Sequence, residues 1–430
     1  MTGEKDMSKK LTVALIGGGN RGVSYTEHMR KFPERYEIVA LAEPLDGRRE
    51  AVKKAYGIAD DMCFANWDEC FAKGKLADIA VIATQDRDHY VPAMKAIELG
   101  YNIMLEKPIS PSPKECAEIA RFAKEKNVRV VVCHVLRYTP HYTTIKNLID
   151  SGELGDILTI NHEENVGHTH HACSYVRGPW GNTGRSSNML LAKSCHDLDL
   201  IQWLLNKKCK KIQSFGALSY FTRENAPADA PERCHENCPH EEKCPYSALK
   251  IYVNAKSTFW RKHATRLPDP TVEDAMHLLR TTQYGKCVFK CDNDVVDHQT
   301  VNMLFEGNTT ATFTMSSTNK GGRWTHIMGT KKEAYIGDSQ TPIRLFDLET
   351  KEMTEIDMNG GGEGAEFGHG GGDYGIVRDM YEYFLGNDPT SQISDIGISA
   401  ENHLLVFAAE QAREQGTVVD IEEYIKSLQD

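Results

Sequence analysis

The sequence predicts an α/β protein in which a parallel sheet, covered by helices on both faces, is followed by a domain with a mostly antiparallel sheet. Three observations predict this arrangement. Apolar runs alternate with helical stretches over the first third of the 430 residues, and these runs are almost uninterrupted, as in strands buried on both faces. After about Tyr138 the pattern changes to short β-rich runs separated by turns.

The first domain is expected to consist of strands joined through helices. Such βαβ units are right-handed and place their strands parallel in one sheet. The expected strands are 11–18, 36–44, 77–84, 101–108 and 128–135, and the expected helices are 23–32, 47–57, 90–100 and 113–127.

The second domain is expected to begin with a helix and to continue mainly as strands. The helix covers 141–152, the β-rich runs cover 156–167, 285–291, 295–307, 309–318 and 333–338, and a last helix at 399–416 ends on a glycine. We therefore predict three parts: a dinucleotide-type domain at 1–136, a substrate-binding and oligomerisation domain at 137–390, and a helical tail at 391–430 that packs back on the body.

Composition excludes several classes of protein. The formal net charge of −11 argues against a general nucleic-acid binder. No run approaches the roughly 20 apolar residues that span a bilayer, and the N-terminal "MTGEKDMSKK" has no apolar signal core. The 12 cysteines are thinly spread, which is typical of a reducing compartment. We expect a cytoplasmic protein without nucleic-acid or membrane partners.

A glycine cluster follows the first expected strand and opens the first helix. Gly17, Gly19 and Gly22 fit G-x-G-x-x-G, in which the glycines allow a tight turn, close approach of a pyrophosphate, and close packing of helix on strand. Glu43 ends the next strand, about 20 residues on, where a carboxylate accepts hydrogen bonds from a ribose. This favours NAD over NADP, although Arg48 nearby is a residue type that holds a 2′-phosphate.

Longer segments make the chain similar to one family of enzymes. These segments are "GGGNRG", "ATQDRDHYVPAMKAIELGYNIMLEKPIS", "RYTPHYTTIKNLIDSGELGDI" and "CHDLDLIQWL". Over nearly its whole length the chain resembles the Gfo/Idh/MocA family, named for glucose–fructose oxidoreductase and inositol dehydrogenase. The resemblance implies an N-terminal Rossmann domain and a C-terminal α/β domain with an open, mostly antiparallel sheet. It also implies NAD(P)-dependent chemistry on sugars or polyols, and homodimers or homotetramers formed through the outer face of that sheet.

The resemblance suggests three catalytic residues. Lys107 matches the lysine of the family's EKP motif, and His196 matches the histidine of its D-x-x-x-H signature, whose aspartate position is Ala192 here. Lys193 is the third candidate, since helical spacing would turn Lys193, His196 and Asp197 to one side. A lysine beside a cationic nicotinamide has a lowered pKa, and histidine titrates near neutrality, so either can move the proton of a reacting hydroxyl.

Two sets of binding residues follow from the glycine motif, the matched segments and the polar stretch from Asn165 to Asn188. That stretch combines hydrogen-bond donors with aromatic rings, which suits a sugar-binding loop; an ordinary solvated loop is the alternative. The expected cofactor contacts are Gly17, Gly19, Asn20, Arg21, Gly22, Glu43, Thr84, His89, Glu106 and Lys107. The expected substrate contacts are Arg137, His168, His170, Tyr175, Arg177, Trp180 and Asp197.

A cysteine cluster lies outside the pattern that the family shares. Cys234, Cys238 and Cys244 are spaced C-x3-C-x5-C, and thiolates suit tetrahedral zinc. The spacing leaves open structural zinc, reduced cysteines without a ligand, and a disulfide. A fourth zinc ligand would come from Cys209, Cys287 or Cys291. We predict no metal at the catalytic site.

These features predict an NAD(P)-dependent oxidoreductase that transfers a hydride between nicotinamide and a secondary alcohol of a sugar, polyol or sugar derivative. One alternative is a redox-neutral, NAD-dependent glycosidase that acts through a 3-keto intermediate. A second alternative, supported by the loss of the aspartate at Ala192, is a redox sensor that binds the cofactor without turnover.

Overall fold

The computed structural model describes residues 9–337, 341–358 and 369–428. Contacts divide the chain into two compact units. The first comprises Met1–Glu153, Ser339–Ile343 and Glu355–Leu404, and the second comprises Leu154–Asp338, Arg344–Thr354 and Leu405–Asp430. This division differs from the predicted boundaries at 136 and 390, because segments distant in sequence pack into each unit.

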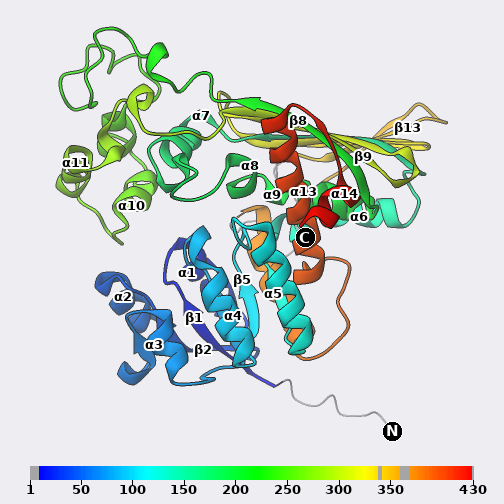
Figure 1. The fold of residues 1–430 in the computed structure, drawn as a ribbon, viewed down its shortest axis with the longest axis horizontal. Coiled ribbons are helices and arrows are strands. Elements are labelled where there is room, and N and C mark those ends of the chain that lie inside the picture. Colours follow the sequence, from blue (N-terminus) through cyan, green and yellow to red (C-terminus); the bar gives the residue numbers. More distant parts are fainter. Residues whose placement is uncertain (1–8, 338–340, 359–368, 429–430) are drawn as a thin grey trace. The chain divides into compact units, whose positions relative to one another are not determined.

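The first unit contains a parallel sheet of six strands in the order β3-β2-β1-β4-β5-β6. This is the order of two mononucleotide-binding halves that meet beside β1. Figure 1 labels β1, β2 and β5 of this sheet. The strands are β1 (Leu11–Ile16), β2 (Tyr36–Ala42), β3 (Cys63–Phe64), β4 (Ile79–Ile82), β5 (Asn102–Leu105) and β6 (Val130–Val132). All five predicted strands are present, and β3 is a short addition at the edge.

Helices join these strands and cover the sheet. They are α1 (Asn20–Met29), α2 (Asp46–Tyr56), α3 (Trp67–Ala72), α4 (Tyr90–Glu98) and α5 (Pro113–Glu125). The start of α5 follows from its sequence, since the Ser112 side chain caps the Glu115 amide and Pro113 occupies the first turn. The helix α6 (Pro140–Asp150) closes the continuous part of the unit.

A helix from near the C-terminus completes the first unit. This is α12 (Gly372–Phe384), which packs beside α1. Ile376, Val377 and Met380 on α12 are buried in the same core as Leu15 and Val131. The contact-based units place this helix in the first unit, whereas the predicted second domain includes it, because sequence order cannot show which core an apolar helix face joins.

The second unit is built on a mixed sheet of nine strands in the order β14-β13-β12-β11-β7-β10-β9-β8-β15. Strands β7 and β10 run parallel, and the neighbouring pairs from β12–β13 through β8–β15 are otherwise antiparallel. The strands are β7 (Ile157–Asn165), β8 (Cys209–Ala217), β9 (His298–Phe305), β10 (Thr310–Ser316), β11 (Gly322–Gly329), β12 (Lys332–Ile336), β13 (Ile343–Asp347), β14 (Met353–Ile356) and β15 (Val418–Asp420). The prediction of a mostly antiparallel sheet is confirmed.

The two faces of this sheet differ. Along β9 and β10 buried and exposed residues alternate, so one face is covered and the other is open. The helix α9 (Cys195–Leu205) packs on β7 and β10 at the covered face, and α14 (Ile421–Ser427) packs on β8. The long helix α13 (Ile396–Gln415) precedes β15.

Some local predictions for the second unit were wrong. Residues 285–291 form short 3₁₀ turns around a single bridge, Arg233 with Lys286, rather than a strand. The expected helix through Lys193 is divided into α8 (Met189–Ala192) and α9. Part of the polar stretch expected as a loop is helical: α7 spans His168–His171 and continues as a π-helical turn, Ala172–Val176.

A helical insertion between β8 and β9 extends the second unit. Figure 1 shows α10 (Phe259–Thr265), α11 (Val272–Thr281) and the loops around them gathered at one end of the sheet. Two small apolar clusters hold the insertion onto the turn at 172–176; one includes Cys173 and Tyr252, the other Val176 and Phe221. No helix among the described residues combines the length and apolar character needed to cross a bilayer.

Candidate active site

The glycine loop lies between β1 and α1 and has the geometry of a phosphate cradle. Gly17 has φ +100°, and a Cβ there would lie 2.5 Å from the Ala83 carbonyl oxygen. A Cβ on Gly22 would lie 2.1 Å from the Gly17 carbonyl oxygen, so this glycine allows the helix to approach the strand. Gly19 precedes α1 without a side-chain cap, which leaves the first N–H groups of the helix to a ligand. Asn20 is the exposed first residue of α1.

Glu43 connects the end of β2 to this loop. Its Oε2 accepts a hydrogen bond from the Gly18 amide at 2.8 Å, and its Oε1 accepts one from the Leu45 amide at 2.9 Å. The buried carboxylate therefore sits at the carboxyl end of the sheet, where a dinucleotide's ribose lies in this type of fold. The Arg48 guanidinium lies beside Gly19, at the edge of the same loop.

Arg21 is held by two carboxylates of the first unit. Its Nε donates to Glu106 Oε1 at 2.7 Å, and its two terminal nitrogens donate to Asp373 Oδ1 and Oδ2 at 2.7 and 2.9 Å. Tyr25 also donates to Glu106, at 2.9 Å. Burial acts to raise the pKa values of Glu106 and Asp373, but the Arg21 charge and hydrogen bonds outweigh it and keep both below their ordinary values. Both carboxylates are consequently ionised at neutral pH.

Lys107 follows this anchored glutamate directly. Its amide donates to Glu106 Oε2 at 2.6 Å, and its charge is one of those that lower the pKa of Glu106. The Lys107–Pro108 peptide is cis. His89 Nδ1 donates to the Pro108 carbonyl at 2.7 Å, and Nε2 lies 3.3 Å from the carbonyl oxygen of Thr84. His89 thus joins the EKP turn to the loop after β4, a role in positioning that the sequence did not indicate.

In the second unit Lys193 belongs to a buried polar cluster on the covered face of the sheet. Lys193 Nζ lies 3.2 Å from Glu164 Oε1, and Arg323 Nη2 lies 2.5 Å from Glu164 Oε2. The β7–β11 register sets this contact, because it pairs Glu164 with Arg323 directly. Hereafter "the Glu164 cluster" means Glu164, Lys193, Arg323, Asp197 and His162.

Asp197 lies at the base of the Glu164 cluster and is 0% exposed. Its Oδ1 accepts hydrogen bonds from Arg323 Nε at 2.7 Å and from His162 Nε2 at 3.0 Å. Burial acts to raise its pKa, but Arg323 and His162 outweigh burial and hold the pKa well below its usual range. The carboxylate is enclosed and positions Arg323, and the substrate contact predicted for Asp197 stays a prediction.

Aromatic rings surround His170 near this cluster. The His170 ring centroid lies 5.8 Å from that of Tyr175 and 5.5 Å from that of Trp260, and Tyr175 in turn lies 6.2 Å from Trp180. Burial, together with the charges of Lys193 and other cations, lowers the pKa of His170 to about 2. His170 is thus a neutral imidazole close to Lys193. Trp260, from the insertion, was not predicted, because nothing in its local sequence marks it as a site residue.

Arg177 was predicted to bind substrate, and this role stays a prediction. The side chain is 2% exposed; its Nε donates to the Lys286 carbonyl and its Nη2 to the Tyr246 carbonyl, each at 2.9 Å. It lies inside the insertion, enclosed by protein.

The other predicted residues occupy varied positions. His196 is buried in the first turn of α9, and His168 Nδ1 donates to the Asn319 carbonyl at 3.2 Å. Arg137 is buried in the first unit, in the short helix Val135–Tyr138. Thr84 follows β4 and donates to the Asp88 carbonyl at 2.9 Å. The substrate roles of His168 and Arg137 and the catalytic role of His196 stay predictions.

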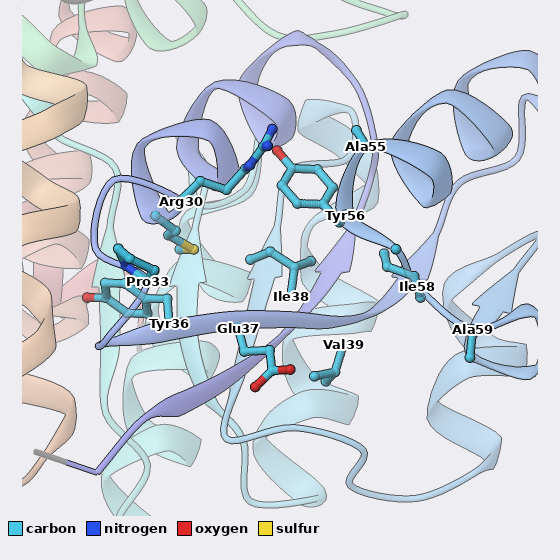
Figure 2. A pocket seen from close by; sticks show the side chains of 12 residues that line it. Arg30, Pro33, Tyr36, Glu37, Ile38, Val39, Ala55, Tyr56, Ile58 and Ala59 are labelled. Atoms are coloured by element: carbon cyan, nitrogen blue, oxygen red, sulfur yellow. The ribbon is translucent and has the colours of Figure 1, made fainter.

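The first unit also has a hollow that lies away from these residues. Figure 2 shows it beside the end of α1 and along β2, with Arg30, Tyr36, Ile38 and Tyr56 among its walls. Its volume is about 500 Å³. Residues that end α1 and begin β2 lie at the amino-terminal edge of a parallel sheet, whereas ligands of such sheets bind at the carboxyl edge. This hollow is therefore not the dinucleotide site.

Comparison with known proteins agrees with this geometry. Residues 11–134 match the family model described as "Oxidoreductase family, NAD-binding Rossmann fold", and residues 142–234 match the Gfo/Idh/MocA C-terminal domain. The chain belongs to the Gfo/Idh/MocA family. Its first unit therefore contains the NAD-binding Rossmann fold of these oxidoreductases, and the resemblance noted in the sequence is confirmed.

Individual relatives of the Gfo/Idh/MocA family are distant. The Bacillus subtilis (strain 168) protein YteT is 25% identical over 383 residues, covering 84% of this chain and 85% of that protein. Inositol 2-dehydrogenase from Arthrobacter sp. (strain FB24) is 26% identical over 253 residues, 58% of this chain and 69% of that enzyme. An Agrobacterium radiobacter oxidoreductase, solved with NAD⁺, L-tartaric acid and magnesium, shares the fold with a TM-score of 0.68 at 14% identity, covering 96% of this chain and 99% of that one.

Proposed function

We propose that this protein oxidises a secondary alcohol of an uncharged sugar, polyol or sugar derivative, with NAD as the hydride acceptor. The observation that carries the proposal is the Glu164 cluster: a charge-balanced set of polar groups near the rings of His170, Tyr175 and Trp260. Hydroxyl groups suit polar partners of this kind, while the C–H faces of a sugar suit aromatic rings.

The charge balance of the cluster favours a neutral substrate. The cations Lys193 and Arg323 are matched by the carboxylates Glu164 and Asp197. Arg185, another cation of the polar stretch, forms a bidentate pair with Asp292 at 2.6 and 2.9 Å. Because each of these cations already has a carboxylate partner, an anionic substrate gains little from them, and a neutral polyol fits better.

His170 supports recognition of hydroxyl groups. At neutral pH its imidazole is uncharged, given a pKa of about 2 set by burial and the neighbouring cations. A neutral imidazole has one donor and one acceptor nitrogen, so it can bind a hydroxyl in either sense.

We assign to Lys107 the role of accepting the proton of the reacting hydroxyl, and His196 and Lys193 are further candidates for this role. The glycine loop and the first N–H groups of α1 would hold NAD, which would supply the hydride acceptor. Glu106, fixed by Arg21 and Tyr25, holds the backbone of Lys107 in place. An unprotonated Lys107 amine would take up the proton of the substrate hydroxyl.

The missing aspartate at Ala192 does not remove a carboxylate from the surroundings of Lys193. Ala192 is buried at the end of α8, and Glu164 reaches Lys193 from β7 at 3.2 Å. Glu164 can therefore orient Lys193. This supports an active enzyme over a sensor that binds NAD without turnover.

The test is a panel of free sugars, polyols and aryl glycosides incubated with NAD or NADP, in which NADH absorbance and released aglycone are both followed. We expect net NADH from at least one free sugar or polyol, with NAD preferred over NADP. Aglycone release without net NADH would identify the redox-neutral glycosidase instead. Cofactor binding without either product would support the sensor.

We further propose that the open face of the nine-stranded sheet makes a homodimer or homotetramer. Strand register places Phe215, Thr300, Thr314, Glu163 and Trp324 in one row across it. Phe215 and Trp324 are exposed large apolar side chains, of the kind that subunit contacts cover. Light scattering on the purified protein tests this, and a monomer would contradict it. A cytoplasmic location is also proposed, because the 12 cysteines are thinly spread along the sequence.

A further inference from the structure

Four cysteines of the insertion line one small cavity. They are Cys234, Cys238, Cys244 and Cys287, and the cavity they share has a volume of about 40 Å³. The electrostatic neighbours of Cys244 include Cys234 and Cys238, and those of Cys287 include Cys234 and Cys244. The sequence left the fourth member of this group open, and the structure selects Cys287 over Cys209 and Cys291.

The backbone fixes Cys234 and Cys287 next to each other. Arg233 and Lys286 form an antiparallel bridge, and on either side of it the Cys234 amide donates to Gly285 at 2.8 Å and the Cys287 amide to Glu232 at 2.9 Å. Consecutive turns hold Cys238 and Cys244. In these turns the Glu241 amide donates to the Cys238 carbonyl and the Cys244 amide donates to the His240 carbonyl. Two segments about fifty residues apart thus present thiols to the same space.

A buried cation, Arg177, lines the same cavity. Arg177 Nη2 lies 3.6 Å from Cys234 Sγ, while its Nη1 is buried with no hydrogen-bond partner among the described residues. Within that part of the chain Arg177 forms no ion pair with a carboxylate. A charge enclosed in this way is costly unless an opposite charge lies beside it.

We propose that Cys234, Cys238, Cys244 and Cys287 bind one structural Zn²⁺ as a tetrathiolate. Each thiol releases its proton to solvent on binding, no electrons are exchanged, and the centre carries two net negative charges. Those charges supply the counter-charge that the buried Arg177 requires. One site therefore explains both the clustered thiols and the enclosed guanidinium.

The size of the cavity and the donor set select zinc. A space of about 40 Å³ holds one small ion or a water and is too small for a multi-iron cluster. Four sulfur donors around a single ion are typical of structural zinc. His240 also lines the cavity, but its Nε2 is already 2.6 Å from Asp229 Oδ1.

Binding requires the thiols to turn toward a common point. Across the described residues no three histidine, cysteine or acidic side chains stand in a ready-made metal geometry. Cys234 Sγ, for example, points to the Lys286 carbonyl oxygen at 3.8 Å. Metal binding deprotonates the thiols, and a thiolate has no proton to donate to a carbonyl oxygen. The cysteine side chains can then rotate so that their sulfurs face one point.

The zinc site would stabilise the turn 172–176, which carries Tyr175 of the proposed substrate region. Arg177 follows the turn 172–176 that carries Tyr175, and it connects that turn to Lys286 and Tyr246. Zinc would fix these segments together. This role is independent of whether the enzyme acts on a sugar, and it can be tested without an activity assay.

The test measures metal on the full-length protein purified without chelator. We expect elemental mass spectrometry to find one zinc per chain. X-ray absorption spectroscopy should show four sulfur neighbours around the zinc at about 2.3 Å. Mercurial modification of the thiols should release that zinc. Cys287→Ser should lower zinc content at least fivefold, whereas the matched variants Cys291→Ser and Cys209→Ser should retain it.

Several results would overturn the site. These are a wild-type protein without metal, a disulfide within the group, iron in place of zinc, or a zinc shell dominated by nitrogen and oxygen. Equal zinc loss from Cys291→Ser would also overturn the assignment of Cys287. If Cys287→Ser does not fold, the wild-type absorption spectrum and mercurial titration decide alone.

Discussion

At the scale of single residues, each unit of the protein pairs one arginine with two buried carboxylates. Arg21 holds Glu106 and Asp373, and Arg323 holds Glu164 and Asp197. A buried carboxylate without such a partner would take up a proton, and its hydrogen-bonding role would reverse. In both places the held carboxylate adjoins a lysine predicted to be catalytic, Lys107 in the first unit and Lys193 in the second.

The first prediction concerns Lys107. Replacing Lys107 by Ala should lower kcat at least about a hundredfold, the usual range for loss of an acid–base group. The melting temperature should hardly change, because the backbone amide of residue 107 donates to Glu106 and alanine keeps this amide. Lys114→Ala, an exposed lysine on α5, is the matched control. A near-normal rate for Lys107→Ala would refute the catalytic role.

The second prediction concerns His171 and pH. Burial lowers the pKa of His171 to about 4, below the value near 6.5 of an unfolded histidine. The unfolded chain therefore binds more protons in this range, so the stabilisation is complete above pH 6.5 and is lost as pH falls towards 4. The loss is at most about 1.4 kcal/mol per pH unit.

Urea unfolding between pH 7.5 and 4.5 measures this effect. His171→Phe retains a ring to stack on Phe221, whose centroid is 5.2 Å away, and should show a shallower decline than the wild type. His277→Gln, at an exposed position on α11, should leave the slope unchanged. Identical slopes for wild type and His171→Phe would show that this histidine does not drive the acid dependence.

Sequence could predict only some of these residues. Lys107 and Lys193 stand beside recognisable motifs. Asp373 meets Arg21 from about 350 positions away, and Glu164 meets Arg323 only through strand register, so neither pairing has a local signal. Arg177 and Asp197 were assigned to substrate because sequence does not distinguish an exposed charge from an enclosed one.

At the scale of elements, the hydrophobic pattern predicted the parallel strands. It did not predict whether a run has a neighbouring strand to pair with, or where a helix is interrupted. The apolar runs of β1 to β6 stand out because helices cover both faces. The alternating run 285–291 resembled a strand, yet it has only the bridge to Arg233 to pair with and forms turns. Lys193 and Ser194 separate α8 from α9, although the residue pattern would permit one helix.

The third prediction tests the junction of β1 and α1. A methyl group on Gly22 would collide with the Gly17 carbonyl oxygen at 2.1 Å and with Leu15 at 2.9 Å. Gly22→Ala should therefore destabilise the fold by about 1–3 kcal/mol and weaken NAD binding at least tenfold. Calorimetry and NAD titration measure the two effects. Gly47→Ala on α2, where a methyl group meets nothing within 4 Å, should be neutral or slightly stabilising; equal behaviour of the two variants would contradict the packing argument.

At the scale of the whole molecule, the chain order and the compact units do not coincide. The region after residue 355 contributes α12 to the first unit, so the C-terminal half of the sequence completes the Rossmann core. The predicted fold class was right because it depends on local periodicity. The predicted boundaries differ from these units, because the units depend on contacts across some 350 residues of sequence.

We propose that this protein moves a hydride from a carbohydrate carbon to bound NAD, and an isotope-transfer experiment can test this claim. Carbon-deuterated sugars and polyols are incubated with the enzyme and NAD, and the cofactor is analysed by mass spectrometry. We predict deuterium in the nicotinamide ring with the wild type, and at least a hundredfold slower transfer with Lys107→Ala. A cofactor that stays free of deuterium across the whole panel, while still binding the protein, would contradict the claim.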